Sequence, residues 1–181
     1  MIVEPLRIPD VKLIRPKVHG DARGFFIESY NDAVFARAGL PTRWVQDNHS
    51  RSARGVLRGL HYQLANPQGK LVRVGRGRVF DVAVDLRRSS PSFGQWAGAE
   101  LTDEGLEMLY VPPGFAHGFL VLSEVADFLY TCTTLWDAPS DRGVRWNDPA
   151  IGIEWPLEPG WPTLSPRDEA QPLLADAETF A

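Results

Sequence analysis

The sequence is poor in the features that build disulfide-rich or membrane-spanning proteins. Cys132 is the only cysteine among 181 residues, which excludes an intrachain disulfide and a zinc site built from cysteines. No apolar run approaches the ~20 residues that a helix needs to cross a bilayer. The start, MIVEPLRIPD, lacks the pattern of a signal peptide. We therefore expect a cytoplasmic protein that does not bind membranes.

The net charge is also small, because 19 basic and 23 acidic residues give −4. Such a surface does not attract a long polyanion over its whole area, so we expect no nucleic-acid polymer as a partner. One stretch is nevertheless basic, since nine Lys and Arg but only two Asp lie between Arg51 and Arg88. Either it is a solvated cationic face or it binds a phosphate or diphosphate. The residues that suit the second role are Arg58, Lys70, Arg73, Arg76 and Arg78.

Helical periodicity is nearly absent as well. One short helix is predicted over Asn31–Ala38, capped by Asn31 or Asp32. Strand patterns recur instead, bounded by Gly, Pro or Ser, over Leu71–Val74, Val79–Leu86, Leu106–Val111, Phe119–Leu122 and Asp127–Trp136. With 16 Gly and 15 Pro to form turns, the chain is predicted to be an all-β sandwich or barrel in a single domain, residues 1–181.

Two segments refine this picture. In the strand predicted over Val79–Leu86, one face is apolar while Asp81 and Asp85 occupy the other, so the strand is half-buried or lines a polar interior. From Pro139 onward, Pro and Asp become frequent and several Trp are interspersed. We expect this segment, about residues 139–181, to form an irregular C-terminal flap against the β body.

The four histidines, His19, His49, His61 and His117, are scattered along the chain. The segment PPGFAHGF (112–119) resembles the second half of the cupin signature, in which a Pro-x-Gly turn delivers a histidine into a small β-barrel. Metal-binding cupins also supply His-x-His and a glutamate. Here residues 61–63 read HYQ, so at most two histidines converge and no metal site is expected.

Without a metal, His61 is a candidate general base, because a free imidazole titrates near neutrality. Asp168 in the flap is a candidate to hold its tautomer, and a turn-forming surface Asp is the alternative. Alternation along 127–136 places Tyr130 and Trp136 on one strand face, which suits either core packing or a proton donor beside an aromatic platform.

Arg58 and His61 impose a geometric condition on the site. Strict alternation puts them on opposite faces of a strand. They reach one ligand only if the strand bulges near Gly59 or if the ligand crosses the rim.

Seven motifs follow one another from about Ile8 to Leu174. They are HGDARGFFIESY (19–30), VQDNHSRSARGVLRGLHYQ (45–63), GKLVRVGRGRVFDVAVDLRRSSPSFGQW (69–96), YVPPGFAHGF (110–119), FLYTCTTLWD (128–137), RGVRWNDPAIGIEWP (142–156) and LSPRD (164–168). In this order they resemble the dTDP-4-dehydrorhamnose 3,5-epimerases, the sugar-nucleotide epimerases of the rhamnose pathway.

The resemblance implies a jelly-roll β-barrel of the cupin class that works as a homodimer without cofactor or metal. The implied reaction inverts carbons 3 and 5 of dTDP-4-dehydro-6-deoxy-D-glucose. His61 is the implied base, Asp168 its partner and Tyr130 the acid. The residues that the resemblance places in the sugar-nucleotide pocket are Arg23, Glu28, Gln46, Asp47, Asn48, Arg58, Lys70, His117, Trp136, Asp141 and Arg167.

The sequence departs from the family pattern in two ways. Asp141 stands where a glutamate is usual, and Leu135 and Trp136 replace a common Tyr-Tyr pair. Three alternative functions stay open: a relative that inverts one carbon only, a sugar-nucleotide 3,4-ketoisomerase, and a non-catalytic cupin that binds sugar nucleotides.

Overall fold

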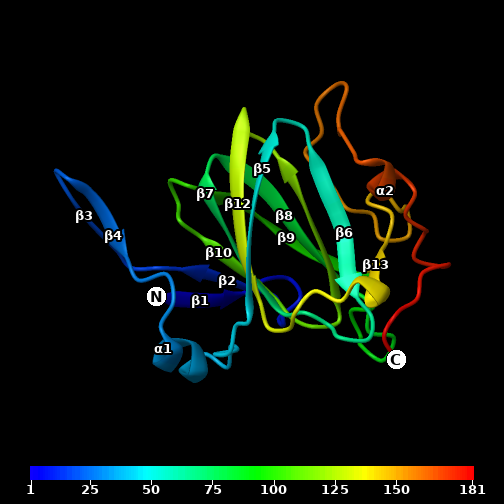
Figure 1. Cartoon of the computed structure of the whole chain (residues 1–181), viewed down its shortest axis with the longest axis horizontal. Helices are drawn as coiled ribbons and strands as arrows, with labels where there is room; N and C mark the ends of the chain where they lie inside the picture. Colours follow the sequence, from blue (N-terminus) through cyan, green and yellow to red (C-terminus); the bar gives the residue numbers. More distant parts are fainter.

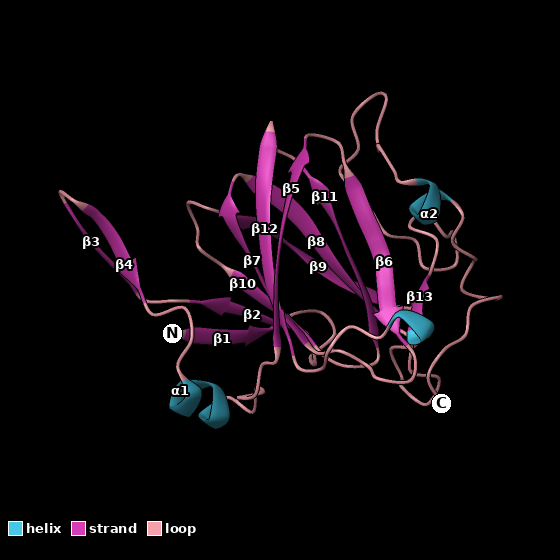
Figure 2. Cartoon of the chain, in the orientation of Figure 1, coloured by secondary structure: helices cyan, strands magenta, loops and turns pink.

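The structure is a computed structural model that describes all 181 residues, and antiparallel strands in two facing sheets dominate it (Figures 1 and 2). The six-stranded sheet has the order β1 (Ile2–Pro5), β2 (Lys12–Arg15), β10 (Met108–Val111), β7 (Lys70–Arg76), β12 (Val125–Cys132) and β5 (Gln46–Ala53). The five-stranded sheet has the order β13 (Asp141–Gly143), β6 (Leu57–Gln63), β11 (Phe115–Val121), β8 (Arg78–Asp85) and β9 (Trp96–Thr102). A separate hairpin joins β3 (Val18–Asp21) to β4 (Gly24–Ile27). The all-β prediction is confirmed.

The helices are few and short. α1 spans Asp32–Arg37 and is capped by Asn31, whose side chain accepts a hydrogen bond from the Val34 N–H at 3.1 Å, as the sequence predicts. The others are a 3₁₀ turn at Ala138–Ser140 and α2 at Pro166–Glu169. No helix has the length and apolar character needed to cross a membrane.

Each predicted strand overlaps an observed one, but the prediction over Asp127–Trp136 is wrong at its end. β12 stops at Cys132, which pairs with Gln46 at the start of β5 and Lys70 at the start of β7. Beyond that point one more backbone hydrogen bond follows, from the Thr133 N–H to the Gly69 carbonyl at 2.9 Å, and then the chain leaves the sheet. The alternation that put Trp136 on the face of Tyr130 therefore fails, and Trp136 is 60% exposed.

Alternating side chains build two main hydrophobic cores. One fills the space between the sheets, where Val72 and Phe128 of one sheet meet Ala83 and Phe119 of the other. The second covers the outer face of the five-stranded sheet. There the C-terminal segment contributes Val144, Ile151, Trp155, Leu174 and Ala177. The predicted flap thus packs on the β body and buries β8 on both faces.

β6 contains a bulge near Gly59, one of the two arrangements that would let Arg58 and His61 reach one ligand. His61 pairs with His117 and Arg58 with Phe119, so three steps along β6 match two along β11. Gly59 has φ +128°, and a Cβ there would lie 2.6 Å from the Gly118 Cα. Only glycine fits, and the extra residue turns Arg58 and His61 toward one cavity.

Replacing Gly59 by alanine should lower the free energy of unfolding by about 2–4 kcal/mol, because left-handed strain adds to a backbone clash. Gly24→Ala is the matched control, since Gly24 has φ +125° but no atom near its missing Cβ. Urea unfolding of both variants separates the clash from the strain. Equal losses in the two variants would contradict this account of the bulge.

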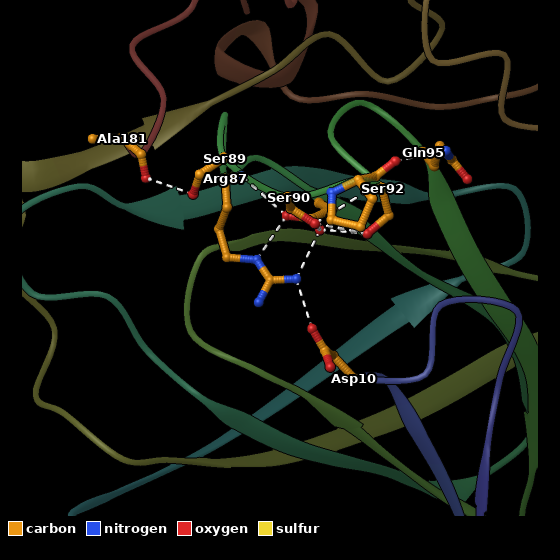
Figure 3. A network of polar contacts seen from close by, with 9 residues as sticks. Asp10, Arg87, Ser89, Ser90, Ser92, Gln95 and Ala181 are labelled. Carbon is orange, nitrogen blue, oxygen red and sulfur yellow. Dashed lines mark hydrogen bonds and ion pairs between the residues drawn. The ribbon is translucent and has the colours of Figure 1, made fainter.

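A polar network at the end of β8 fastens the loop before β9 (Figure 3). Asp85 is fully buried and accepts hydrogen bonds from Arg87, Ser90 and Ser92 at 2.6–2.9 Å. Arg87 also reaches Asp10 at 2.7 Å, which ties the loop to the N-terminal segment. Burial opposes ionisation of Asp85, but these hydrogen bonds outweigh it and lower the pKa to about 2.

Asp85→Asn should therefore destabilise the fold at pH 7 by about 2–3 kcal/mol. The Asp pKa is lower in the folded state than its unfolded value of about 3.9, so this stability is present above pH 4 and is lost as pH falls toward about 2. Urea unfolding at several pH values should show the difference between wild type and variant shrinking over that window. A difference that stays constant down to about pH 2 would contradict it.

Candidate active site

A cleft of about 620 Å³ opens between the two sheets, bounded by β5 and β12 on one side and by β6 and the segment before α2 on the other. It brings together side chains from segments more than 100 residues apart in sequence. The predicted site residues that line it are Asn48, Arg58, His61, Lys70, His117, Tyr130, Arg167 and Asp168.

The His61 imidazole and the Asp168 carboxylate form a direct pair. Oδ1 of Asp168 lies 2.6 Å from Nε2 of His61. The carboxylate can only accept, so Nε2 carries the hydrogen and Nδ1 is left with a lone pair. Burial opposes ionisation of Asp168, but hydrogen bonds from His61, Ser165 and the Gly59 backbone lower its pKa below the usual value. Asp168 is therefore the ionised partner that can hold an imidazole acting as a general base.

Tyr130 lines the same cleft from β12, in the opposite sheet. Burial raises the pKa of its phenol, so the hydroxyl keeps its proton at neutral pH. The Lys70 ammonium lies 5.9 Å from the centre of the Tyr130 ring, and the Lys70 side chain is almost fully buried. Burial lowers the pKa of Lys70. An imidazole, a phenol and a buried cation thus surround one cavity.

A second histidine–aspartate pair lies at the floor of the cleft. Nε2 of His117 is 3.0 Å from both carboxylate oxygens of Asp81, which is fully buried on β8. Burial lowers the pKa of His117 despite Asp81, so the ring is neutral at neutral pH. β8 therefore lines a polar interior, the second of the two possibilities that its sequence left open. No group of three or more His, Cys, Asp and Glu side chains gathers to ligate a metal.

Trp136 links the two sheets at one end of the cleft. Its backbone N–H donates to Oε1 of Gln46 at 2.7 Å, and Gln46 in turn donates to Asn48. The indole N–H donates to Oδ2 of Asp141 at 3.3 Å, and the same oxygen pairs with Arg167 at 2.8 Å. Two of the three positions that depart from the family pattern, Trp136 and Asp141, thus contact each other.

Six predicted site residues are not part of the lining of this cleft. Gln46, Trp136 and Asp141 make the contacts just described, and the other three lie elsewhere. Arg23 lies in the turn of the β3–β4 hairpin and Glu28 directly follows β4, and this hairpin projects away from the barrel on the side opposite α2 (Figure 1). Arg23 pairs with Asp21 within that hairpin. Asp47 lines a different hollow, on the outer face of the six-stranded sheet.

Of the two interpretations of the basic stretch, binding to one anion does not apply to most of the five residues that suited it. Arg73 lines the hollow on the outer face of the six-stranded sheet, because it alternates with Lys70 and Val72 along β7. Arg76 lies at the other end of β7, and Arg78 pairs with Glu100. Only Arg58 and Lys70 of the predicted set reach the cleft.

Sequence reasoning missed Asp81 and Ser165 as site residues. Asp81 stands on the polar face of an otherwise apolar strand, and that pattern could have marked it as a partner for a buried cation or imidazole. Ser165 lies three residues before Asp168, the spacing of a helix N-cap.

A cleft with a carboxylate-held imidazole and a facing phenol, inside a jelly-roll barrel of the cupin class, defines a proton-transfer enzyme. A family model described as dTDP-4-dehydrorhamnose 3,5-epimerase matches residues 5–176, and the chain belongs to that family. The predicted family and the cupin-like fold are both confirmed.

Individual relatives agree with this assignment. The dTDP-4-dehydrorhamnose 3,5-epimerase of Pseudomonas aeruginosa is 57% identical, and the match covers 97% of each chain. A crystal structure of the 3,5-epimerase of Legionella pneumophila with dTDP-4-keto-L-rhamnose is 48% identical, with a TM-score of 0.94 over 98% of this chain and 94% of that one. A dTDP-4-dehydrorhamnose 3-epimerase of Streptomyces niveus is 42% identical over 98% of this chain and 86% of its own.

Proposed function

We propose that this protein inverts carbons 3 and 5 of dTDP-4-dehydro-6-deoxy-D-glucose and so forms dTDP-4-dehydro-L-rhamnose. The observation that carries the proposal is the His61–Asp168 pair facing Tyr130 across one cleft. Proton transfer of this kind changes no oxidation state of the sugar, so it needs no redox cofactor, and the proposed enzyme uses neither cofactor nor metal.

The chemistry follows from the 4-keto group of the substrate. The hydrogens on carbons 3 and 5 are both α to the carbonyl, so removal of either gives an enolate. Nδ1 of His61 takes the proton from one face, and Tyr130 returns a proton from the other, which inverts the carbon. Negative charge that develops on the carbonyl oxygen is stabilised by the buried Lys70 ammonium.

The remaining cations and polar groups hold the nucleotide. Arg58 and Arg167 line the cleft and suit the diphosphate, because a guanidinium binds phosphate oxygens bidentately. His117 and Asn48 complete the walls around the sugar. The exposed Trp136, held by Gln46 and Asp141, offers a flat face at the rim.

For Arg23 and Glu28 to bind the sugar nucleotide, as the family resemblance implies, a second copy of the chain is required. Neither residue lines the cleft of its own subunit, and their hairpin exposes Phe25 and Phe26 by 60% and 69%. A homodimer would bury this apolar surface and carry both side chains to the partner's cleft. Asp47, on the outer face of the six-stranded sheet, would then lie at or near the same interface. The cytoplasmic location stays a prediction from the single cysteine.

The test is incubation with dTDP-4-dehydro-6-deoxy-D-glucose in heavy water, followed by NMR. Deuterium at both carbons 3 and 5 supports double epimerisation. Label at one carbon only would make the protein a single-carbon epimerase, the activity that the name of the 42% identical relative describes. A carbonyl moved to carbon 3 would identify a ketoisomerase, and binding without exchange would identify a non-catalytic cupin.

A further inference from the structure

We propose that Ser165 is a positioning residue that holds the Asp168 carboxylate in line with His61. The inference rests on the proposed function, because it gives His61 the role of base. The Ser165 hydroxyl makes two hydrogen bonds with the same residue. It accepts from the Asp168 backbone N–H at 3.1 Å and donates to Oδ2 of Asp168 at 2.7 Å.

The two oxygens of Asp168 therefore have separate side-chain partners, in addition to the hydrogen bond from the Gly59 backbone. Oδ1 accepts from Nε2 of His61 at 2.6 Å, while Oδ2 accepts from the Ser165 hydroxyl at 2.7 Å. A carboxylate bound at one oxygen only can rotate about its terminal bond. Bound at both, it keeps one plane, and so the imidazole that donates to it keeps one orientation with Nδ1 free.

The short helix makes this second bond necessary. α2 has four residues, too few to be stable by its own hydrogen bonds, so Asp168 depends on local contacts for its position. Ser165 begins the helix as its N-cap, and Pro166 follows at the first helical position. The residue that starts the helix is thus also the one that orients its buried carboxylate.

Capping alone does not account for the geometry. An N-cap oxygen needs only to accept a backbone hydrogen bond, as Asn31 does for α1. The Ser165 hydroxyl has one hydrogen to donate, and that hydrogen is directed to Oδ2 of Asp168. Asn31→Ala is consequently a matched control that removes a cap without touching the His61–Asp168 pair.

Four variants test the proposal by steady-state kinetics: Ser165→Ala, Ser165→Thr, Asp168→Ala and the double variant Ser165→Ala/Asp168→Ala. Ser165→Ala should lower kcat roughly 10- to 100-fold with KM unchanged, the loss expected for one hydrogen bond to a charged group. Ser165→Thr, which keeps both hydrogen bonds, should restore kcat. In the Asp168→Ala background, loss of Ser165 should cost nothing further, because Ser165 acts through Asp168.

Several results would overturn it. A wild-type kcat in Ser165→Ala would remove the role, and a raised KM at constant kcat would make Ser165 a substrate contact instead. A further loss in the Asp168→Ala background would show an effect through the helix as a whole. Asn31→Ala should lower the melting temperature but not kcat.

A readout that needs no turnover keeps the inference separate from the proposed function. The proton NMR signal of the His61 Nε2–H, hydrogen-bonded to Asp168, should be sharp in wild type and Ser165→Thr and broadened in Ser165→Ala. If wild type shows this signal but no deuterium exchange, the proposed function fails while the positioning role stands. An unchanged signal in Ser165→Ala overturns the positioning role.

Discussion

His61→Ala should lower kcat roughly 10²- to 10⁴-fold and abolish deuterium uptake at both carbons, while substrate affinity stays close to wild type. Nδ1 of His61 is the free basic nitrogen of the pair, since Nε2 is engaged by Asp168 at 2.6 Å. The cations proposed to hold the diphosphate, Arg58 and Arg167, come from other positions and are untouched by the change. The loss should therefore fall on the chemical step and leave binding intact.

Two further measurements make this prediction specific. Calorimetric titration with dTDP should give nearly the same affinity for wild type and His61→Ala. Asp168→Asn should show a smaller loss than His61→Ala, because the base remains but loses the charge that stabilises its protonated form. Residual exchange at either carbon in His61→Ala would mean that another group takes that proton, and the assignment of one base to both carbons would fail.

The sequence predicts the strands well because each strand is a local pattern. Alternation, branched side chains and turn residues lie within a few positions of one another, and all five predicted segments overlap real strands. The end of β12 is different, because it depends on where β5 and β7 begin, far away in the chain. The local sequence pattern does not show where the neighbouring strands end. The prediction therefore continued the strand to Trp136, which lies beyond it.

The site required more than local pattern. His61 and Asp168 are 107 residues apart. Reasoning from the residues left Asp168 as either a partner of His61 or a turn-forming surface residue, and the resemblance to a family favoured the partner role. The bulge at Gly59 could be inferred, since Arg58 and His61 had to face one ligand, and the register of β6 and β11 confirms it. The Asp81–His117 pair was not foreseen, because the register of β8 and β11 determines it.

The basic stretch between Arg51 and Arg88 contains more cations than reach the cleft. Arg51 pairs with Asp127, Arg78 with Glu100 and Arg87 with Asp85, so ion pairs on the body of the protein take up much of the local charge. The exposed pair of Arg78 and Glu100 contributes little to stability by itself, whereas the Asp85 carboxylate that Arg87 holds is fully buried. Of the basic stretch, only Arg58 and the buried Lys70 line the cleft. Their two positive charges suit the diphosphate of one sugar nucleotide and not a nucleic-acid polymer.

Tyr130→Phe should separate the two halves of the reaction. Without the phenol, inversion should fall roughly 10²- to 10⁴-fold, because no donor is left on the face opposite His61. His61 still removes the proton and returns a solvent-exchanged one to the same face, so deuterium should enter the unreacted substrate at carbons 3 and 5 without inversion. This pattern is the opposite of His61→Ala, in which exchange and inversion disappear together.

Tyr110→Phe is the control for Tyr130→Phe. Tyr130 is half-buried, whereas Tyr110 is buried and packs with Phe35 and Met108 on the outer face of the six-stranded sheet. Burial raises the pKa of both phenols, and for Tyr110 it reaches about 12, so both hold their protons at neutral pH. Only loss of the Tyr130 phenol, which lines the cleft, should lower the rate of inversion. Product analysis by NMR measures both inversion and deuterium exchange. If Tyr130→Phe inverts the substrate at the wild-type rate, or if it loses exchange together with inversion, Tyr130 is not the acid that completes each inversion.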